Sequence, residues 1–119
     1  MLNDATCFKA VHIVTGYTDL RSGIDGLASI IEGQLGEKPF IPDTLFLFCG
    51  RRTDRIKGLV WEDDGFLLLY KRLAQGKFQW PRNEQDVCTL TPQQFRWLME
   101  GLSIAPKRIV RQVKPQFLA

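Results

Sequence analysis

Charged residues that could do chemistry are concentrated in one stretch of the chain, from Cys49 to Leu73. Basic side chains cluster at positions 51–57 and 71–72, and three consecutive acids lie between the clusters at 62–64. Clustered carboxylates can hold divalent metal ions that assist the cutting of nucleic acid. Clustered Arg and Lys side chains can instead bind phosphates through charge-assisted hydrogen bonds. The stretch therefore suggests three readings: a metal-dependent active site, a nucleic-acid surface, or an ordinary charged hairpin.

The metal-dependent reading relies on Asp19, Asp25 and Asp54 as ligands. Asp19 is better explained as the N-cap of a predicted helix, and Asp63 and Asp64 as turn residues, because Asp accepts hydrogen bonds from nearby backbone groups in both settings. The six-residue spacing of Asp19 and Asp25 does not place them on one helix face. The single histidine lies in a predicted strand, and the chain has no phosphate-binding Gly-rich motif. We expect no catalytic residue, no metal site and no cofactor, and keep a metal-dependent nuclease as an alternative.

A predicted hairpin positions the basic clusters. Residues 56–61 and 66–73 are typical of strands, and Asp64-Gly65 is a favoured pair for the tight turn between them. In an antiparallel hairpin, the end of the second strand lies beside the start of the first. The pattern therefore predicts a basic end, where the clusters meet, and an acidic tip at the turn. The candidate nucleic-acid-binding residues are Arg51, Arg52, Arg55, Lys57, Lys71, Arg72 and Lys77. The competing interpretation is a solvated surface that Asp54 and nearby acids partly neutralise.

Turn signals and apolar spacing predict the remaining elements. Strands are expected at 10–15 and 44–49, and a brief run at 87–90 leads into the second helix without an assigned element. Apolar residues every three or four positions predict a helix that begins at Thr18 or Asp19 and stops at Gly36. A second helix is expected over 92–101, with Thr91 as its N-cap.

The predicted strands are apolar nearly without alternation, which indicates that both faces of their sheet are covered, by helices or by another protein. The order β-α-β-β-β-α predicts an α+β domain with a mainly antiparallel sheet and two helices. A homo-oligomer is one partner that such strands allow.

Composition sets the limits of these hypotheses. The 119 residues are 45% hydrophobic and carry a net charge of +3, which fits one domain over residues 1–105 and a basic tail over 106–119. The three cysteines are far apart, without metal-site or disulfide-framework spacing. No signal peptide and no apolar run long enough to span a membrane are apparent. We expect a soluble cytoplasmic protein without a membrane partner.

An ordered series of motifs covers most of the chain, from about residue 11 to 101. The series is TDLRSGIDGL at 18–27, RRTDRIK at 51–57, Trp61, DGF at 64–66, YKRL at 70–73, GKF at 76–78 and WP at 80–81. It resembles the small accessory proteins called TnpB, or Orf2-like, of the insertion sequence 66 family of bacterial transposable elements. Thr53 stands where relatives often carry another basic residue.

The resemblance implies a role in transposition beside a separate large transposase that cuts DNA. It assigns no catalytic residue to the small protein. Four further positions match the family motif without an assigned role, namely Asp19, Arg21, Asp25 and Asp54. The leading hypothesis is a non-catalytic accessory protein that binds element-end DNA, the transposase and other element-encoded proteins, or both. A protein-interaction module without DNA contact is the second hypothesis.

Overall fold

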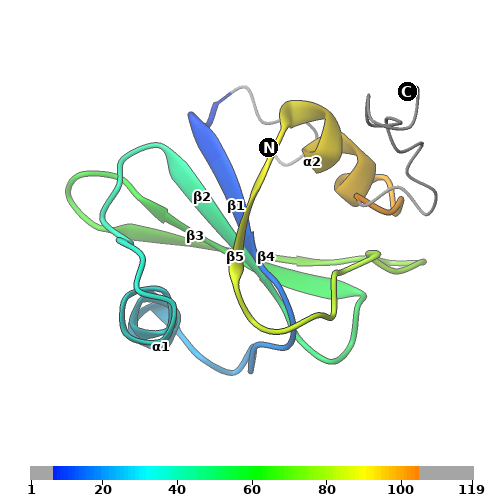
Figure 1. Ribbon diagram of the computed structural model, residues 1–119, viewed down its shortest axis with the longest axis horizontal. Helices are drawn as coiled ribbons and strands as arrows, with labels where there is room; N and C mark the ends of the chain where they lie inside the picture. The colour runs from blue at the N-terminus through cyan, green and yellow to red at the C-terminus, as the bar shows by residue number, and fades with distance from the viewer. Residues whose placement is uncertain (1–6, 105–119) are drawn as a thin grey trace, which may run out of the picture.

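The computed structural model describes residues 7–104, which form one five-stranded sheet with a helical layer on each face (Figure 1). Short strands of β-branched and aromatic residues alternate with turns, as expected for half-buried or buried sheet segments. The elements are β1 (Ala10–Val14), α1 (Ile24–Ser29), a π-helical turn η1 (Ile30–Gln34), β2 (Thr44–Cys49), β3 (Arg55–Trp61), β4 (Phe66–Arg72), β5 (Val87–Leu90) and α2 (Pro92–Met99).

The strand order across the sheet is β4-β3-β2-β1-β5. The β1–β2 pair is parallel because α1 and η1 form the crossover between them, and the other three pairs are antiparallel. This arrangement confirms the predicted α+β class and the mainly antiparallel sheet. It adds a fifth strand to the predicted order, because the short run at 87–90 pairs with β1 along the edge of the sheet.

Both faces of the central part of the sheet are buried by the chain itself. On one face, α1 and η1 pack Leu27 and Ile31 against the strand residues Phe46, Phe48 and Leu59. The other face is covered by α2 and by the segment that carries Phe78 and Trp80. All six residues of β2 are consequently buried. The prediction that continuous apolar strands need two covers is therefore confirmed for the central strands, whose covers are the chain's own helices and loops, whereas the apolar edge strand β4 is only partly buried.

The first helix is shorter than predicted. It begins at Ile24, not at Thr18 or Asp19, and its N-cap is Gly23. The backbone N–H of Thr18 donates to the Cys49 carbonyl at 3.0 Å, and Asp19 accepts from Arg21 N–H at 3.0 Å. Ser22 N–H also donates to the Asp19 carbonyl, so residues 19–22 form a separate turn before the helix, and the N-cap role predicted for Asp19 is wrong.

The second helix and the hairpin turn follow the sequence closely. Thr91 caps α2, since its hydroxyl accepts from Gln94 N–H and the Gln94 side chain accepts from Thr91 N–H. In the β3–β4 turn, Glu62 N–H donates to the Gly65 carbonyl at 2.9 Å, and Asp63 has a φ of 70°. The acidic turn lies where it was predicted, but it is centred on Asp63-Asp64 and not on the Asp64-Gly65 pair, with Asp63 as the residue in the left-handed conformation.

Two sequence predictions concern residues that the structure does not describe. The expected basic tail at 106–119, and with it the boundary at 105/106, lies outside residues 7–104.

Within residues 7–104, no helix is long and apolar enough to cross a membrane.

Candidate functional site

The β3–β4 hairpin brings the two basic clusters together as predicted. Arg55 lies opposite Arg72, Ile56 opposite Lys71, and Lys57 opposite Tyr70. Trp61 and Phe66 pair at the other end, beside the acidic turn. The ribbon therefore has a basic end (Arg51, Arg52, Arg55, Lys57, Lys71, Arg72) and an acidic tip (Glu62, Asp63, Asp64).

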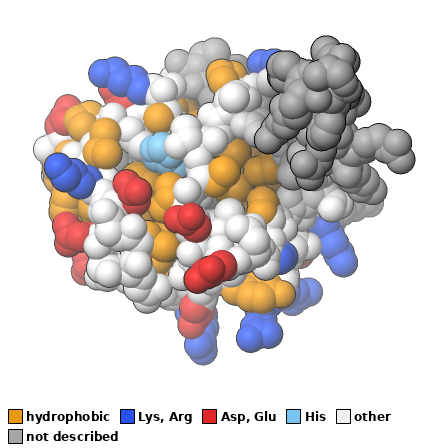
Figure 2. All heavy atoms as spheres, in the orientation of Figure 1, with side chains coloured by type: hydrophobic (Ala, Val, Ile, Leu, Met, Phe, Trp, Pro, Cys, Tyr) orange, Lys and Arg blue, Asp and Glu red, His pale blue; other side chains and the backbone are white. Residues whose placement is uncertain are grey.

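Part of the basic end opens into a hollow of about 940 Å³, which we call the basic hollow. Its charged lining comprises five basic side chains and one acid, Asp19. Figure 2 shows Lys and Arg side chains gathered along the lower rim of the molecule, where the loops after β1 and β2 lie in Figure 1. The lining residues are Tyr17, Thr18, Asp19, Leu20, Arg21, Gly50, Arg51, Arg52, Arg55, Lys57, Leu68 and Tyr70.

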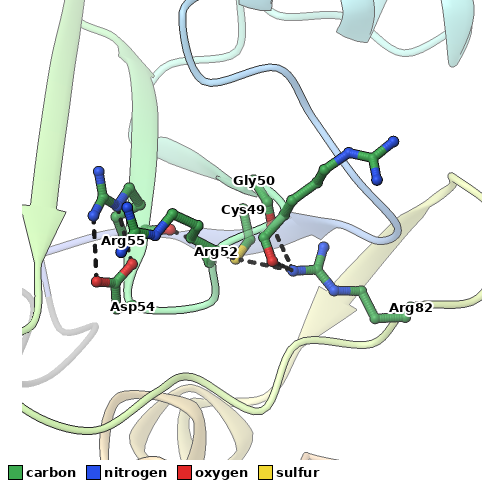
Figure 3. Close-up of polar contacts among 7 residues, drawn as sticks. Cys49, Gly50, Arg52, Asp54, Arg55 and Arg82 are labelled. Carbon is green, nitrogen blue, oxygen red and sulfur yellow. Dashed lines mark hydrogen bonds and ion pairs between the residues drawn. The ribbon is translucent and has the colours of Figure 1, made fainter.

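Three segments far apart in the sequence form the hollow, and Arg82 joins two of them. Its guanidinium donates to the Gly16 carbonyl at 2.7 Å. It also donates to the Gly50 carbonyl, as Figure 3 shows. The same group lies over the Tyr17 ring, with its central carbon 4.2 Å from the ring centroid. A planar guanidinium can bind two carbonyls and stack on a ring at once, which an ammonium group cannot do. Arg82 therefore fixes the loop after β1 against the loop after β2.

Close backbone contact reinforces this junction. Gly50 is buried, and a Cβ atom at this position would lie 3.2 Å from Leu20 Cγ and 3.5 Å from the Thr18 carbonyl oxygen. A glycine therefore lets the two loops approach each other. Lys57 adds a bond from β3, because its Nζ donates to the Ser22 carbonyl at 3.1 Å. The walls of the basic hollow are thus held by tertiary contacts.

Cys49 lies beneath this junction and is fully buried. Its thiol is within 3.5 Å of the Arg55 carbonyl oxygen, and the Arg82 guanidinium donates to the sulfur at 3.8 Å (Figure 3). Burial raises the pKa of the Cys49 thiol to about 11. Cys49 is therefore a neutral thiol at physiological pH and serves packing, not nucleophilic attack.

Two of the five lining cations are paired with acids. The exposed Arg21 holds Asp19 through an ion pair of 2.8 Å, and its side-chain hydrogen bonds lower the pKa of Asp19 to about 2. Arg55 binds Asp54 at 2.9 Å, and this side-chain hydrogen bond lowers the pKa of Asp54. Both acids are therefore ionised at neutral pH and offset part of the positive charge. The predicted neutralisation by Asp54 is confirmed for Arg55.

The other three lining cations, Arg51, Arg52 and Lys57, form no ion pair with the described part of the chain. Arg51 and Arg52 are exposed in the loop after β2. The Arg51 guanidinium lies over Tyr17 at 5.3 Å, and Lys57 Nζ is 6.0 Å from the Tyr70 ring centroid. The basic hollow thus combines an excess of positive charge with tyrosine rings.

The remaining candidate residues lie beside the hollow without lining it. Leu73 N–H donates to the Asp54 carbonyl, which places the end of β4 next to the loop after β2. Phe78 N–H donates to the Thr53 carbonyl at 2.7 Å and brings the chain at Lys77 close to the same loop. Of the family-motif residues, Asp19 and Arg21 line the hollow, Asp54 pairs with Arg55, and Asp25 is exposed on α1 away from the lining.

The carboxylates proposed for the nuclease alternative do not assemble. Within residues 7–104, no three His, Cys, Asp or Glu side chains form a group that could hold a metal ion. Asp19 and Asp54 are instead bound to arginines. His12 packs on Phe46 with ring centroids 5.1 Å apart, and its Nδ1 shares a hydrogen bond of 2.9 Å with the Thr89 hydroxyl.

Sequence reasoning underestimated two residues of the site, Tyr17 and Arg82. Tyr17 directly follows a glycine after β1, and Arg82 follows Trp80-Pro81 in a polar segment. Neither residue lies in a recognisable binding motif or in a periodic apolar pattern. Their roles depend on loops that are 31 or more residues apart, so no local pattern could reveal them.

Comparisons with known proteins agree with the motifs. Uncharacterized protein y4hO of Sinorhizobium fredii (strain NBRC 101917 / NGR234) is 37% identical over 93 residues, covering 77% of this chain and 79% of that protein. Uncharacterized protein y4jC of the same organism is 30% identical over 92 residues, covering 77% of this chain and 78% of that protein. No solved structure matches the chain. The model of the family described as IS66 Orf2 like protein matches residues 9–109. The chain therefore belongs to the IS66 Orf2-like family.

Proposed function

We propose that this protein is a non-catalytic accessory factor in transposition of an insertion sequence, and that its basic end binds the phosphate backbone of element-end DNA. The family supplies the biological setting. The observation that carries the molecular part is the lining of the basic hollow, where three cations without an acidic partner surround an opening of about 940 Å³. The separate transposase, together with other element-encoded proteins, is the partner that this role requires.

Phosphate binding follows from the chemistry of these side chains. Arg51 and Arg52 present exposed guanidinium groups, which can bind a phosphate through two parallel hydrogen bonds. DNA carries a condensed layer of counterions, and their release on contact with Lys and Arg favours binding. The acidic tip lies at the opposite end of the same ribbon and repels phosphate. The charge distribution therefore favours one orientation of the protein on DNA.

A protein-interaction module without DNA contact was motivated by the apolar strands. The faces of the central strands are covered by α1, α2 and the segment that carries Phe78 and Trp80, whereas the edge strand β4 is only partly buried and offers such a module an apolar surface. A module that acts through its apolar strands would also leave the unpaired cations around the hollow unexplained. DNA binding explains these unpaired cations, and we therefore prefer it to a protein-interaction module without DNA contact.

A salt titration of DNA affinity tests the proposal. Binding of element-end DNA should weaken steeply with salt, and Arg51→Ala/Arg52→Ala should reduce the slope of log affinity against log salt by about two, since each phosphate contact contributes about 0.9. The matched control is Lys9→Ala/Arg96→Ala, which removes the same charge from two exposed residues outside the lining.

Two results would contradict the proposal. One is an absence of binding at low salt. The other is an equal loss of slope in both double variants, which would indicate that only net charge matters. Co-purification with the transposase, measured on the same variants, separates DNA contact from protein contact.

A further inference from the structure

We propose that the basic hollow binds an unpaired DNA strand, with bases stacked on Tyr17 and Tyr70 and phosphates bound by the surrounding Arg and Lys side chains. This inference rests on the proposed function and specifies its ligand. The experiments distinguish a failure of single-strand binding from a failure of the proposed DNA-binding function.

Tyr17 is exposed yet firmly held. Its side chain is among the exposed large hydrophobic groups, at 54%. Arg82 lies over the ring and is itself bound to the Gly16 and Gly50 carbonyls. Tertiary hydrogen bonds therefore hold in place the side chain that packs on the Tyr17 ring. The other cation near the ring, Arg51, is exposed and without an acidic partner, so it can move to a phosphate when a base arrives. A fixed, solvent-facing ring beside an exposed cation without an acidic partner suits base stacking.

Tyr70 supplies a second ring to the same hollow from the edge strand β4. It is 55% exposed, and Lys57 lies 6.0 Å from its ring centroid. Lys57 is fixed in turn by its bond to the Ser22 carbonyl. Each tyrosine is therefore paired with at least one cation, which repeats the combination of ring and charge that a nucleotide requires.

The apolar part of the hollow selects an unpaired strand over a duplex. Leu20, Leu68 and the two tyrosines contribute to its lining, so a ligand that fills it must bring an apolar or aromatic group as well as phosphate. Duplex DNA presents phosphates and sugars to such a site and keeps its bases stacked inside the helix. An unpaired strand presents both backbone and base faces.

The other exposed aromatic cluster of the described chain lacks this combination. Phe40, Trp61 and Phe66 pack with centroids 5.0–5.3 Å apart beside the acidic tip. Its carboxylates would repel a phosphate backbone. The cluster therefore provides a matched control, because Phe40 is 53% exposed, close to the value for each tyrosine.

The experiment compares three fluorescent probes of about 12 nucleotides, a length within the range of known single-strand sites. The probes are a single strand, its duplex, and an abasic single strand. The protein variants are Tyr17→Ala, Tyr70→Ala, Tyr70→Trp and Phe40→Ala, with circular dichroism of each as a fold check. Cross-linking of a strand that contains iodouracil to the unmodified protein, followed by peptide mapping, gives a readout that does not depend on any variant.

We expect the single strand to bind at least tenfold more tightly than the duplex or the abasic strand. Each tyrosine-to-alanine change should weaken single-strand binding by about fivefold or more and leave duplex binding within about twofold. Tyr70→Trp should retain affinity, Phe40→Ala should have no effect, and cross-links should map to Tyr17 or Tyr70.

Equal affinity for the three probes, or tyrosine variants that bind the single strand like the unmodified protein, would overturn this inference. If binding then still depended on Arg51 and Arg52, the proposed function would stand. If no probe bound at low salt, both proposals would be wrong.

Discussion

The two ends of the β3–β4 ribbon are built in opposite ways. The acidic tip is local: one bond between Glu62 and Gly65 and one left-handed residue, Asp63, close the turn. The basic end is assembled from distant segments. Arg82 reaches back to Gly16, and Lys57 reaches back to Ser22, 35 residues away.

This difference separates two sources of surface charge. The charges of the tip are a consequence of turn chemistry, because Asp is favoured in such turns for its tolerance of positive φ. The charges of the basic end lie around a hollow that exists only after the loops have docked. Local turn chemistry therefore explains the acids of the tip, whereas it does not explain the cations around the hollow.

The largest expected effect is on the junction that forms the hollow. Arg82→Ala removes charge-assisted bonds to the Gly16 and Gly50 carbonyls, so we expect it to lower the free energy of unfolding by about 2–4 kcal/mol in a urea titration. Arg82→Lys should recover less than half of this loss, because an ammonium group cannot reproduce the planar, forked set of N–H donors of a guanidinium. Arg96→Ala, on the exposed face of α2, is the control, with an expected change within about 0.5 kcal/mol.

A smaller effect is expected at the tip. Asp63→Val should destabilise the protein by about 1–2 kcal/mol, because a β-branched side chain opposes the φ of 70°. Asp64→Val removes the same charge from the neighbouring turn position and should cost less than about 0.5 kcal/mol. Equal losses in the two variants, measured by urea titration, would indicate that charge and not backbone conformation stabilises the tip.

The smallest effect concerns the ion pair at the rim of the hollow. The pKa of Asp19 is held at about 2 by the Arg21 hydrogen bonds, below its ordinary value of 3.8. Because the folded-state pKa is depressed, the pair favours folding above pH 3.8, and this contribution disappears as the pH falls through 2. Arg21→Ala should move the pKa of Asp19 back toward 3.8 in an NMR titration of the carboxyl carbon. A value that stays near 2 would mean that other groups, such as Lys57, hold Asp19 ionised.

The accuracy of the sequence predictions follows the same division between local and long-range contacts. Thr91-Pro92 predicted the start of α2 because capping involves residues three apart. The meeting of the two basic clusters followed from the predicted hairpin, but the register that sets Arg55 opposite Arg72 centres the turn on Asp63-Asp64, one residue before the expected Asp64-Gly65 pair. The start of the first helix was wrong, because the Thr18 backbone bonds to Cys49, 31 residues away.

The amino-acid sequence by itself determined the α+β class, the acidic turn, the capped second helix and the family motifs, since each depends on neighbouring residues or on apolar periodicity. The tertiary structure alone decided which charges surround a hollow, which are neutralised, and which rings lie exposed beside them. Arg82 and Tyr17 illustrate the reason. Their interactions join loops that are distant along the chain, and long-range contacts of this kind leave no periodic or local pattern in the sequence.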